Sequence, residues 1–327
     1  MRDFLEWEHG LHGKVDEVNQ RLLEAIYTDQ PDLYRMSRYT IEAGGKRFRP
    51  LLTILAFEIS SEEHYSRIMD LAAGYELIHT ASLIHDDIID NASTRRGRPT
   101  LNAIEGTANA IVVGDYLFAK AYELGSRYGP VVSKIMADAS SRLAEGQTLE
   151  AFNLGNLGIP ESVYYEIISN KTARFFEACA LGATTAAGAP SYVVKSLAEF
   201  AYNLGMAFQI TDDILDIVGN PDKLGKPVFS DLRHNAITLP LIHLREALPK
   251  DQWARVVQLM DSNSKESSET EIKKAMLSAG SIDYAFEVAR KYSEKALNAL
   301  KNSPKSPDIN LLMELAMIVI QRINELS

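Results

Sequence analysis

An acidic motif occurs twice inside long apolar stretches, and this repetition restricts the fold more than any other feature of the sequence. The first copy lies in LIHDDIID, residues 83–90, and the second in QITDDILD, residues 209–216. Carboxylates four residues apart share one helix face, where a pair of like charges about 6 Å apart costs about 3 kcal/mol at an effective dielectric constant of about 20. Because the flanking residues are apolar, both motifs are expected on largely buried helices that need cations to offset the repulsion.

The apolar periodicity is helical along most of the chain. Long helices are predicted for residues 70–90, 164–189 and 192–219, and amphipathic helices for residues 281–302 and 306–327. The second and third are apolar around most of their circumference, so they are expected at the centre of a bundle. A break separates them at Gly188-Ala189-Pro190, and the serine-rich segment 261–271 predicts a solvated connection. The pattern predicts an all-α protein.

Charge and composition exclude several classes of function. The net charge is −10, so bulk electrostatics does not draw the chain to phosphate backbones, and we expect no nucleic-acid partner. The single cysteine, Cys179, cannot form an intrachain disulfide and indicates a reducing, cytoplasmic compartment. The charged sequence MRDFLEWEHG is not typical of a signal peptide, and no apolar run is long enough for a transmembrane segment.

The aspartates of the two motifs are the candidate metal ligands. All-oxygen, carboxylate-rich sites suit Mg²⁺, with Mn²⁺ as an alternative, better than Zn²⁺. Mg²⁺ usually keeps coordination positions for water and substrate phosphate, so a metal-bound polyphosphate would offset the repulsion. The six candidates are Asp86, Asp87, Asp90, Asp212, Asp213 and Asp216.

Three basic clusters support a phosphate-binding function. They are Lys46, Arg47 and Arg49 in GGKRFRP, Arg95, Arg96 and Arg98 in TRRGRPT, and Lys171 with Arg174 in NKTARFF. Arginine forks match phosphate oxygens, and lysine supplies a point charge. Each cluster alone is typical of a salt-bridged surface. Together, with one of them following the first acidic motif by five residues, they favour an anion site.

These motifs resemble those of the trans-isoprenyl diphosphate synthases, the polyprenyl synthetase family. The resemblance rests on LIHDDIIDNASTRRGRPT and GMAFQITDDILD, with GGKRFRP and KTA in the family's order, and runs from about Gly44 to Leu241. It implies the isoprenoid synthase fold, a single-domain helical bundle over residues 1–327 around a central cavity, and a homodimer. It also implies a Mg²⁺-dependent trans-prenyltransferase that condenses isopentenyl diphosphate with an allylic diphosphate.

The resemblance also implies roles for individual residues. Mg²⁺ is coordinated by Asp86, Asp90 and Asp212, with Asp87, Asp213 and Asp216 in support, and the allylic diphosphate is held with help from Arg95 and Lys171. Gln209 and Lys226 are also expected to bind substrate. A metal-free pocket of Lys46, Arg49, His79 and Arg96 holds isopentenyl diphosphate. The expected catalytic residues are Lys171, Thr172, Gln209 and Lys226, of which Thr172 and Gln209 offer oxygen dipoles to a carbocation. From the sequence alone, a hydrogen-bonded core amide is an equally good interpretation of Gln209.

Product length is expected to depend on the turn before the first motif. The residues four and five positions before Asp86 are Ser82 and Ala81, both small, and Ile78 lies one turn further back. In the resembled family, bulky aromatic residues at these positions give short products. We therefore expect an open tunnel and a product of geranylgeranyl length or longer, which would allow loose membrane association. Close helix packing is the other explanation for the small residues.

One stretch departs from the family pattern. GKPVFSDLRHNAITLP has Phe229 where glycine is usual and Asn235-Ala236 where Gly-Lys is usual, so a lysine that contacts the allylic diphosphate is missing. Arg233 and His234 are candidates to replace it. The departure motivates a second hypothesis, a non-catalytic or regulatory subunit of a heteromeric synthase. The two aspartate triads disfavour a terpene cyclase, and the basic clusters disfavour a non-catalytic metal-binding protein.

Overall fold

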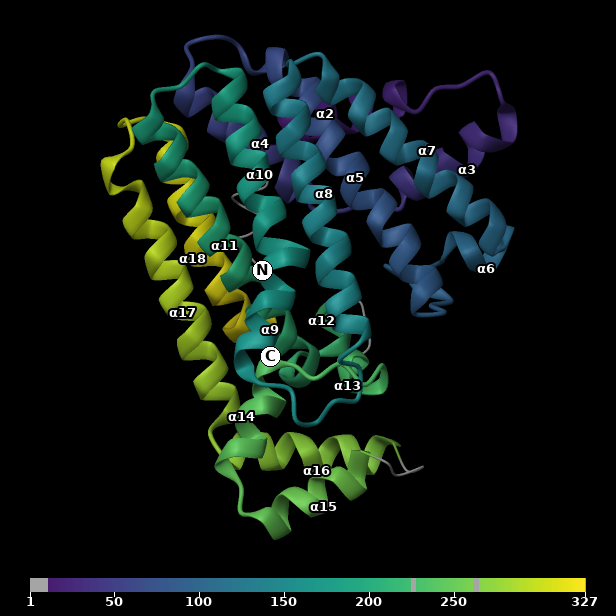
Figure 1. Cartoon of the computed structure of the whole chain (residues 1–327), viewed down its shortest axis with the longest axis vertical. Coiled ribbons are helices and arrows are strands. Elements are labelled where there is room, and N and C mark those ends of the chain that lie inside the picture. Colours follow the sequence, from purple (N-terminus) through teal and green to yellow (C-terminus); the bar gives the residue numbers. More distant parts are fainter. Residues whose placement is uncertain (1–10, 225–227, 261–264, 327) are drawn as a thin grey trace.

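Helices form nearly all the regular structure of the computed structural model, which describes residues 11–224, 228–260 and 265–326 (Figure 1). The helical elements are α2 (His12–Ala25), α3 (Pro31–Glu42), α4 (Phe48–Ser60), η1 (Tyr65–Ile68), α5 (Met69–Ile89), α6 (Leu101–Glu105), α7 (Thr107–Ser126), α8 (Pro130–Ala151), α9 (Glu161–Ile168), η2 (Ser169–Ala173), α10 (Arg174–Ala186), α11 (Ser191–Val218), α12 (Pro221–Leu224), α13 (Ser230–Arg233), α14 (Leu239–Ala247), α15 (Lys250–Met260), α16 (Lys265–Ser278), α17 (Ser281–Ala299), η3 (Leu300–Asn302) and α18 (Pro307–Leu326). A short antiparallel pair, β1 (Thr94–Arg95) and β2 (Arg98–Pro99), lies between α5 and α6. The predicted all-α class is confirmed.

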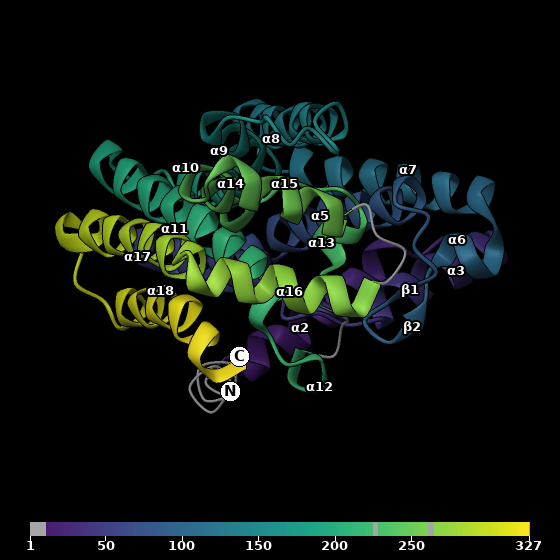
Figure 2. The same ribbon diagram turned by 90° about the horizontal axis from the view of Figure 1, so that it is seen from below.

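The long helices α5, α10 and α11 lie at the centre of the bundle. Helix α5 packs along α7, α10 packs against α4, α8 and α11, and α11 packs along α17 and α18. Seen from below, these central helices lie between α8 on one side and α2 with α18 on the other (Figure 2). The all-round apolar character of the sequences of α10 and α11 agrees with this position. No helix in the described ranges combines the length and the apolarity that a membrane span requires.

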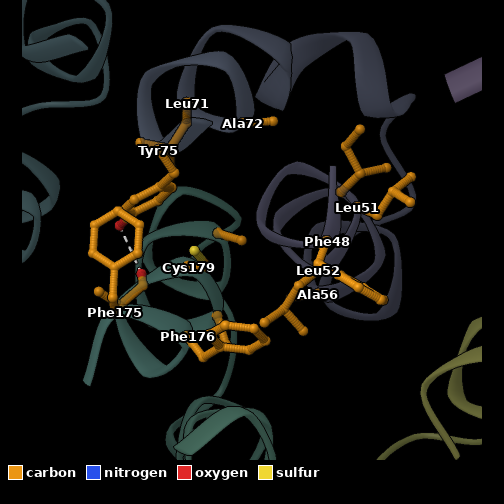
Figure 3. Packing of buried hydrophobic residues seen from close by; sticks show 14 of the residues in the cluster. Phe48, Leu51, Leu52, Ala56, Leu71, Ala72, Tyr75, Phe175, Phe176 and Cys179 are labelled. Atoms are coloured by element: carbon orange, nitrogen blue, oxygen red, sulfur yellow. Dashed lines mark hydrogen bonds between the residues drawn. The ribbon is translucent and has the colours of Figure 1, made fainter. Parts of the chain in front are cut away.

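An aromatic cluster joins α4, α5 and α10 (Figure 3). Tyr75, Phe175 and Phe176 are fully buried, and the Tyr75 hydroxyl donates to the carbonyl oxygen of Ala178 at 2.6 Å. Gly182 makes room for this hydroxyl, because a Cβ at that position would lie 2.4 Å from it. The cluster therefore fixes α5 against α10, on the N-terminal side of the first acidic motif.

Two segments differ from the sequence-based expectation. Residues Ser169–Ala173 form a π turn between α9 and α10, where the pattern predicts one uninterrupted helix. A π turn changes the register of the helix without changing the type of residue on either side, so periodicity does not reveal it. The predicted connection 261–271 is wrong from Lys265 onward, where α16 begins, and its first four residues lie outside the described ranges. Burial of Ile272 and Met276 on α16 stabilises this helix.

Candidate active site

The loop before α4 is organised by a buried ion pair. Gly44 and Gly45 have φ values of 79° and 147°, and Arg47 has φ 50°, so the loop turns sharply. Arg47 donates from Nη1 to Glu76 Oε1 at 2.8 Å and from Nε to Asn19 Oδ1 at 2.8 Å. Arg47 and Glu76 are only 5% and 3% exposed. Arg47 is therefore part of the core, and the expectation of a phosphate-binding cluster does not hold for this residue.

Arg49, on the first turn of α4, has a guanidinium that is only partly paired. Its Cζ lies 5.4 Å from the ring centre of Phe175 and 5.0 Å from that of Phe176. Burial lowers the pKa of Arg49, and its Nε is buried without a hydrogen-bond partner among the described residues. A buried guanidinium nitrogen without an acceptor is costly, so this side chain is suited to binding an anion.

The hairpin of β1 and β2 brings Arg96 to the loop that precedes α4. Arg96 and Gly97 connect β1 to β2 with φ values of 52° and 73°, as a two-residue primed turn requires. The Arg96 guanidinium donates to the carbonyl oxygen of Gly44 and lies beside Gly45, where a Cβ would approach Nη1 to 2.8 Å. Glycine at position 45 therefore allows two basic segments to meet.

His79 of α5 completes this basic region. Burial and the nearby Arg49 and Arg96 lower the pKa of His79 well below its ordinary value, so the imidazole is neutral and can donate or accept a hydrogen bond. Lys46 is exposed on the same loop. The four residues predicted for one pocket thus lie in one region, and their role in binding stays a prediction.

The three aspartates of the first motif have different surroundings at the C-terminal end of α5. Asp87 is buried and accepts a hydrogen bond from Arg95 Nε at 2.7 Å. Asp86 is half-buried, and burial raises its pKa to about 6 although Lys171 and Arg95 oppose the shift. Asp90 caps the helix and is exposed. Asp86 and Asp90 are therefore open to a ligand, whereas Asp87 orients Arg95.

Lys171 links the first motif to the second. It lies on the π turn η2 and donates a hydrogen bond to Glu150 of α8. Burial lowers its pKa, but the negative charges of Glu150, Asp86 and Asp90 raise it above the ordinary value. Thr172, the next residue, donates from Oγ1 to Gln209 Oε1 at 2.9 Å. The π turn thus presents a charged ammonium near the first motif and a hydroxyl to α11.

The second motif is held by groups from distant parts of the chain. Asp212 is half-buried, and its Oδ1 lies 3.1 Å from Nη2 of Arg322 on α18. Asp216 is buried and accepts hydrogen bonds from the backbone N–H groups of Ser230 at 3.1 Å and Asp231 at 3.0 Å, so it caps α13. Asp212 therefore contacts a positive charge of the protein, Arg322, whereas Asp216 holds the start of α13 in place.

Asp213 is the most enclosed acid of the second motif. Tyr164 donates from its hydroxyl to Asp213 Oδ2 at 2.6 Å, and Gln209 donates from Nε2 to Oδ1 at 2.9 Å. Burial raises the pKa of Asp213 to about 7, although these two donors lower it. The predicted catalytic side chains Thr172 and Gln209 therefore belong to one network anchored on Asp213.

The donor set fits a hard divalent cation. Asp86, Asp90 and Asp212 are the least enclosed of the six carboxylates, and oxygen ligands of this kind suit Mg²⁺ or Mn²⁺. In the part of the chain that the structure describes, no three acidic, histidine or cysteine side chains are already grouped as a metal cage. Mutual repulsion disfavours such a cluster of carboxylates without a cation.

A cavity of about 100 Å³ lies beside Ala236, where the family usually has lysine. Its lining includes Ala236, Lys171, Gln209 and Asp213. Arg233, one candidate to replace the missing lysine, instead donates to Glu269 from Nε at 2.8 Å and Nη2 at 2.9 Å.

His234, the other candidate, contacts the carbonyl oxygen of Ser230 through Nδ1 at 2.9 Å. Neither side chain is directed to a phosphate site by these contacts. Lys226, which the sequence predicts to be catalytic, lies outside the described residues.

Arg174 does not belong to the phosphate site as its sequence position suggests. It donates to Glu177 at 2.8 Å and lies over the ring of Tyr202 at 4.9 Å. Lys171 lies within the π turn and Arg174 follows it, so the two cations of the third basic cluster have different partners, Glu150 and Glu177. Sequence reasoning also missed Arg322 and Tyr164, and the spacing of the chain gives no signal for either.

The residues predicted to control product length lie on α5 before the first motif. Ile78 and Ala81 are fully buried, and Ser82 is 6% exposed and donates to the carbonyl oxygen of His79 at 2.8 Å. Tyr75 lies two turns before Ser82 and crosses to α10. Small, buried side chains therefore precede the first motif, with an aromatic ring further back on α5, and a role for them in product length stays a prediction.

The fold and the site together define an all-α protein with acidic motifs on α5 and α11 and a basic region formed by the start of α4, the β1–β2 hairpin and α5. The model of the polyprenyl synthetase family matches residues 30–278, and the chain belongs to this family. Membership confirms the expected class of enzyme, a trans-prenyltransferase.

Individual relatives agree with this assignment. The octaprenyl diphosphate synthase of Haemophilus influenzae is 35% identical over 309 residues, with 94% of each chain covered. The heptaprenyl diphosphate synthase component 2 of Geobacillus stearothermophilus is 34% identical over 307 residues, with 93% of this chain and 94% of the relative covered. The crystal structure of geranylgeranyl pyrophosphate synthetase from Pyrococcus horikoshii superposes with a TM-score of 0.91 at 34% identity, covering 98% of this chain and 99% of that one.

Proposed function

We propose that the protein is a Mg²⁺-dependent trans-prenyltransferase that condenses isopentenyl diphosphate with an allylic diphosphate. The product is a trans-polyprenyl diphosphate of geranylgeranyl length or longer. The observation that carries this proposal is the division of charge. Asp86, Asp90 and Asp212 are the least enclosed acids, while Arg49 on α4 and Arg96 on the β1–β2 turn form a separate basic region.

The two regions suit two diphosphates with different needs. Bound Mg²⁺ would neutralise the allylic diphosphate as its C–O bond breaks, which is where negative charge develops. Arg95, oriented by Asp87, and Lys171 add fixed positive charge on the same side. Isopentenyl diphosphate binds the basic loop, where the unpaired Nε of Arg49 offers a hydrogen bond to its phosphate.

The carbon chemistry takes place between these two anions. The double bond of isopentenyl diphosphate attacks the allylic carbocation, and a proton then leaves to the released pyrophosphate. The oxygen atoms of Thr172 and Gln209, which are hydrogen-bonded to each other at 2.9 Å, would stabilise this positive charge without forming a bond. Water is kept out by the apolar residues of α5, α10 and α11.

We further propose one polyprenyl synthetase domain over residues 1–327, a homodimer in the cytoplasm, and loose membrane association through the product. A second candidate is a subunit of a heteromeric synthase. Ala236 in place of the usual lysine favours it, and one relative is named as a component of a synthase. The first hypothesis requires the purified chain to be active alone, whereas the second requires a partner subunit for activity.

The test is incubation of the purified chain with isopentenyl diphosphate, an allylic primer and Mg²⁺, followed by mass analysis of the products. We expect condensation that EDTA abolishes and that Asp86→Asn and Asp212→Asn each reduce at least a thousandfold, as expected for about 4 kcal/mol of lost transition-state stabilisation. Activity in EDTA would overturn the metal-dependent mechanism. An inactive chain that gains activity only with a second protein would establish the heteromeric alternative.

A further inference from the structure

A continuous hydrogen-bond relay runs from Tyr164 to the expected reaction centre. Tyr164 donates to Asp213 Oδ2, Gln209 Nε2 donates to Asp213 Oδ1, and Thr172 Oγ1 donates to Gln209 Oε1. The distances are 2.6, 2.9 and 2.9 Å. Three segments that are far apart in the sequence, α9, η2 and α11, contribute one member or more.

We propose that Tyr164 is a positioning residue that acts through Asp213 to fix the orientation of the Gln209 amide during condensation. This inference rests on the proposed function. A glutamine amide can present either its oxygen or its NH₂ group in one place, and only the oxygen stabilises a nearby carbocation. Both oxygens of Asp213 accept hydrogen bonds, Oδ2 from Tyr164 and Oδ1 from Gln209, so Oδ1 selects the NH₂ group of Gln209 and leaves its oxygen toward Thr172.

Tyr164 is needed because Asp213 would otherwise be free to turn. The carboxylate is 4% exposed and Tyr164 is 3% exposed, so no bulk water replaces the phenol. With Oδ2 held by the Tyr164 hydroxyl, Oδ1 stays directed at Gln209. Tyr164, Gln209 and Asp213 also line the same 100 Å³ cavity as Lys171, so the relay borders the site where charge develops.

A purely structural role for Tyr164 makes different predictions. A buried hydroxyl contributes to stability wherever it is bonded, and its loss then lowers the melting temperature without a specific effect on turnover. The adjacent Tyr165 provides a matched control, because its hydroxyl bonds Glu161 and it lies on the same helix. Tyr165 makes none of the relay contacts described above.

The experiment is a double-mutant cycle with Tyr164→Phe and Gln209→Leu in the full-length protein with Mg²⁺. We expect Tyr164→Phe to lower kcat about tenfold with both KM values within about twofold of wild type, because only the transition state is affected. In the Gln209→Leu background, Tyr164→Phe should have no further effect on kcat. Tyr165→Phe should leave kcat unchanged, and thermal melting of every variant measures folding separately.

Two results would overturn the inference while leaving the proposed function intact. One is an unchanged kcat for Tyr164→Phe in an active enzyme, and the other is an equal loss of kcat in both backgrounds. If Tyr164→Phe does not fold, Asp213→Asn is the second variant, because an Asn side chain is isosteric and lacks the selective acceptor. It should show the same loss and the same dependence on Gln209. A wild-type protein without condensation would overturn the proposed function and this inference together.

Discussion

Arg322 on α18 places its Nη2 3.1 Å from Oδ1 of Asp212 on α11, so a guanidinium lies on the first acid of the second motif. The Arg322 side chain is 11% exposed, and its Cζ lies 5.3 Å from the ring centre of Phe208. Its Nε and Nη1 are buried without hydrogen-bond partners among the described residues. Asp212 is thus neutralised by a cation of the protein itself, which any metal must share or displace.

This relationship predicts that Arg322→Gln strengthens metal binding in the absence of substrate. A competing positive charge is removed, and an interaction of about 0.7–1.4 kcal/mol corresponds to a three- to tenfold lower Kd. Titration of the protein with Mn²⁺, with the free ion measured by electron paramagnetic resonance, would detect the change. Arg290→Gln, which removes an exposed ion pair with Glu287 on α17, should leave the Mn²⁺ affinity unaltered. Weaker Mn²⁺ binding by Arg322→Gln would contradict the competition.

The first motif predicts a pH dependence of metal binding. Burial raises the pKa of Asp86 to about 6, so its carboxyl group is protonated below that pH and ionised above it. A proton and a metal ion compete for the carboxylate. Mn²⁺ affinity should therefore be constant above about pH 7 and fall as the pH drops below 6, by up to about tenfold per pH unit.

The matched variant for this prediction is Asp86→Asn, which removes the titrating group and keeps its shape. Its Mn²⁺ affinity should be lower at pH 8 and should lose the part of the pH dependence that is centred near 6. An identical pH profile in Asp86→Asn would show that another group controls binding, with Asp213 the first to examine because burial raises its pKa to about 7.

Periodicity predicts helices well where burial dominates. The apolar runs around residues 70–90 and 192–219 predict α5 and α11, because a buried helix requires such residues on every side. The π turn at η2 is not predictable in this way, because it only inserts one extra residue into a turn of an otherwise continuous helix. The start of α16 is missed because polar, serine-rich residues form its first turn.

Residue type identifies the charged groups of the site but does not distinguish their partners. Asp86 and Asp87 are adjacent and identical, yet Asp86 is half-buried near Lys171, whereas Asp87 is buried and accepts a hydrogen bond from Arg95. Arg47 and Arg49 stand in one motif, yet only Arg49 keeps an unpaired nitrogen. These differences depend on contacts between distant segments, as the pairing of Asp212 with α18 also does. A single sequence contains no local signal for such contacts.

The departure at Ala236 predicts an effect that is confined to one substrate. Ala236 borders the cavity that also contains Lys171 and Asp213, and Arg233 is held by Glu269. Ala236→Lys would supply the absent ammonium, and a charge-assisted hydrogen bond of about 1.5–3 kcal/mol should tighten binding of the allylic diphosphate by roughly ten- to a hundredfold. Isopentenyl diphosphate affinity should hardly change.

Isothermal calorimetry with a non-hydrolysable allylic analogue and Mg²⁺ would measure this effect. Ala236→Gln is the control, because it adds a side chain of related length without charge. Equal affinity in the lysine and wild-type proteins would mean that another cation already acts on the allylic diphosphate. A change in isopentenyl diphosphate binding instead would place position 236 nearer the second pocket.

Product length depends on how far the apolar tail can extend along α5. Ala81 and Ser82 precede Asp86 by about one turn, 6–7 Å at 1.5 Å per residue, and neither fills the space a bulky aromatic would occupy. Tyr75 lies about 16 Å before Asp86 and is tied to the carbonyl oxygen of Ala178, with Gly182 making room for its hydroxyl. Tyr75 carries the only Phe, Tyr or Trp ring of α5, so we expect this ring to limit how far the tail extends.

Wild-type enzyme with excess isopentenyl diphosphate is therefore expected to make geranylgeranyl diphosphate or longer products. Ala81→Phe should shorten the distribution while the first condensations continue, because the new ring fills the channel near its opening. Tyr75→Ala should lengthen it, and Tyr75→Phe, which keeps the ring, should leave it unchanged. Chromatography of the dephosphorylated products would measure all four proteins. A wild-type product that stops at farnesyl length, or an unaltered ladder in Ala81→Phe, would place the tail along a different path.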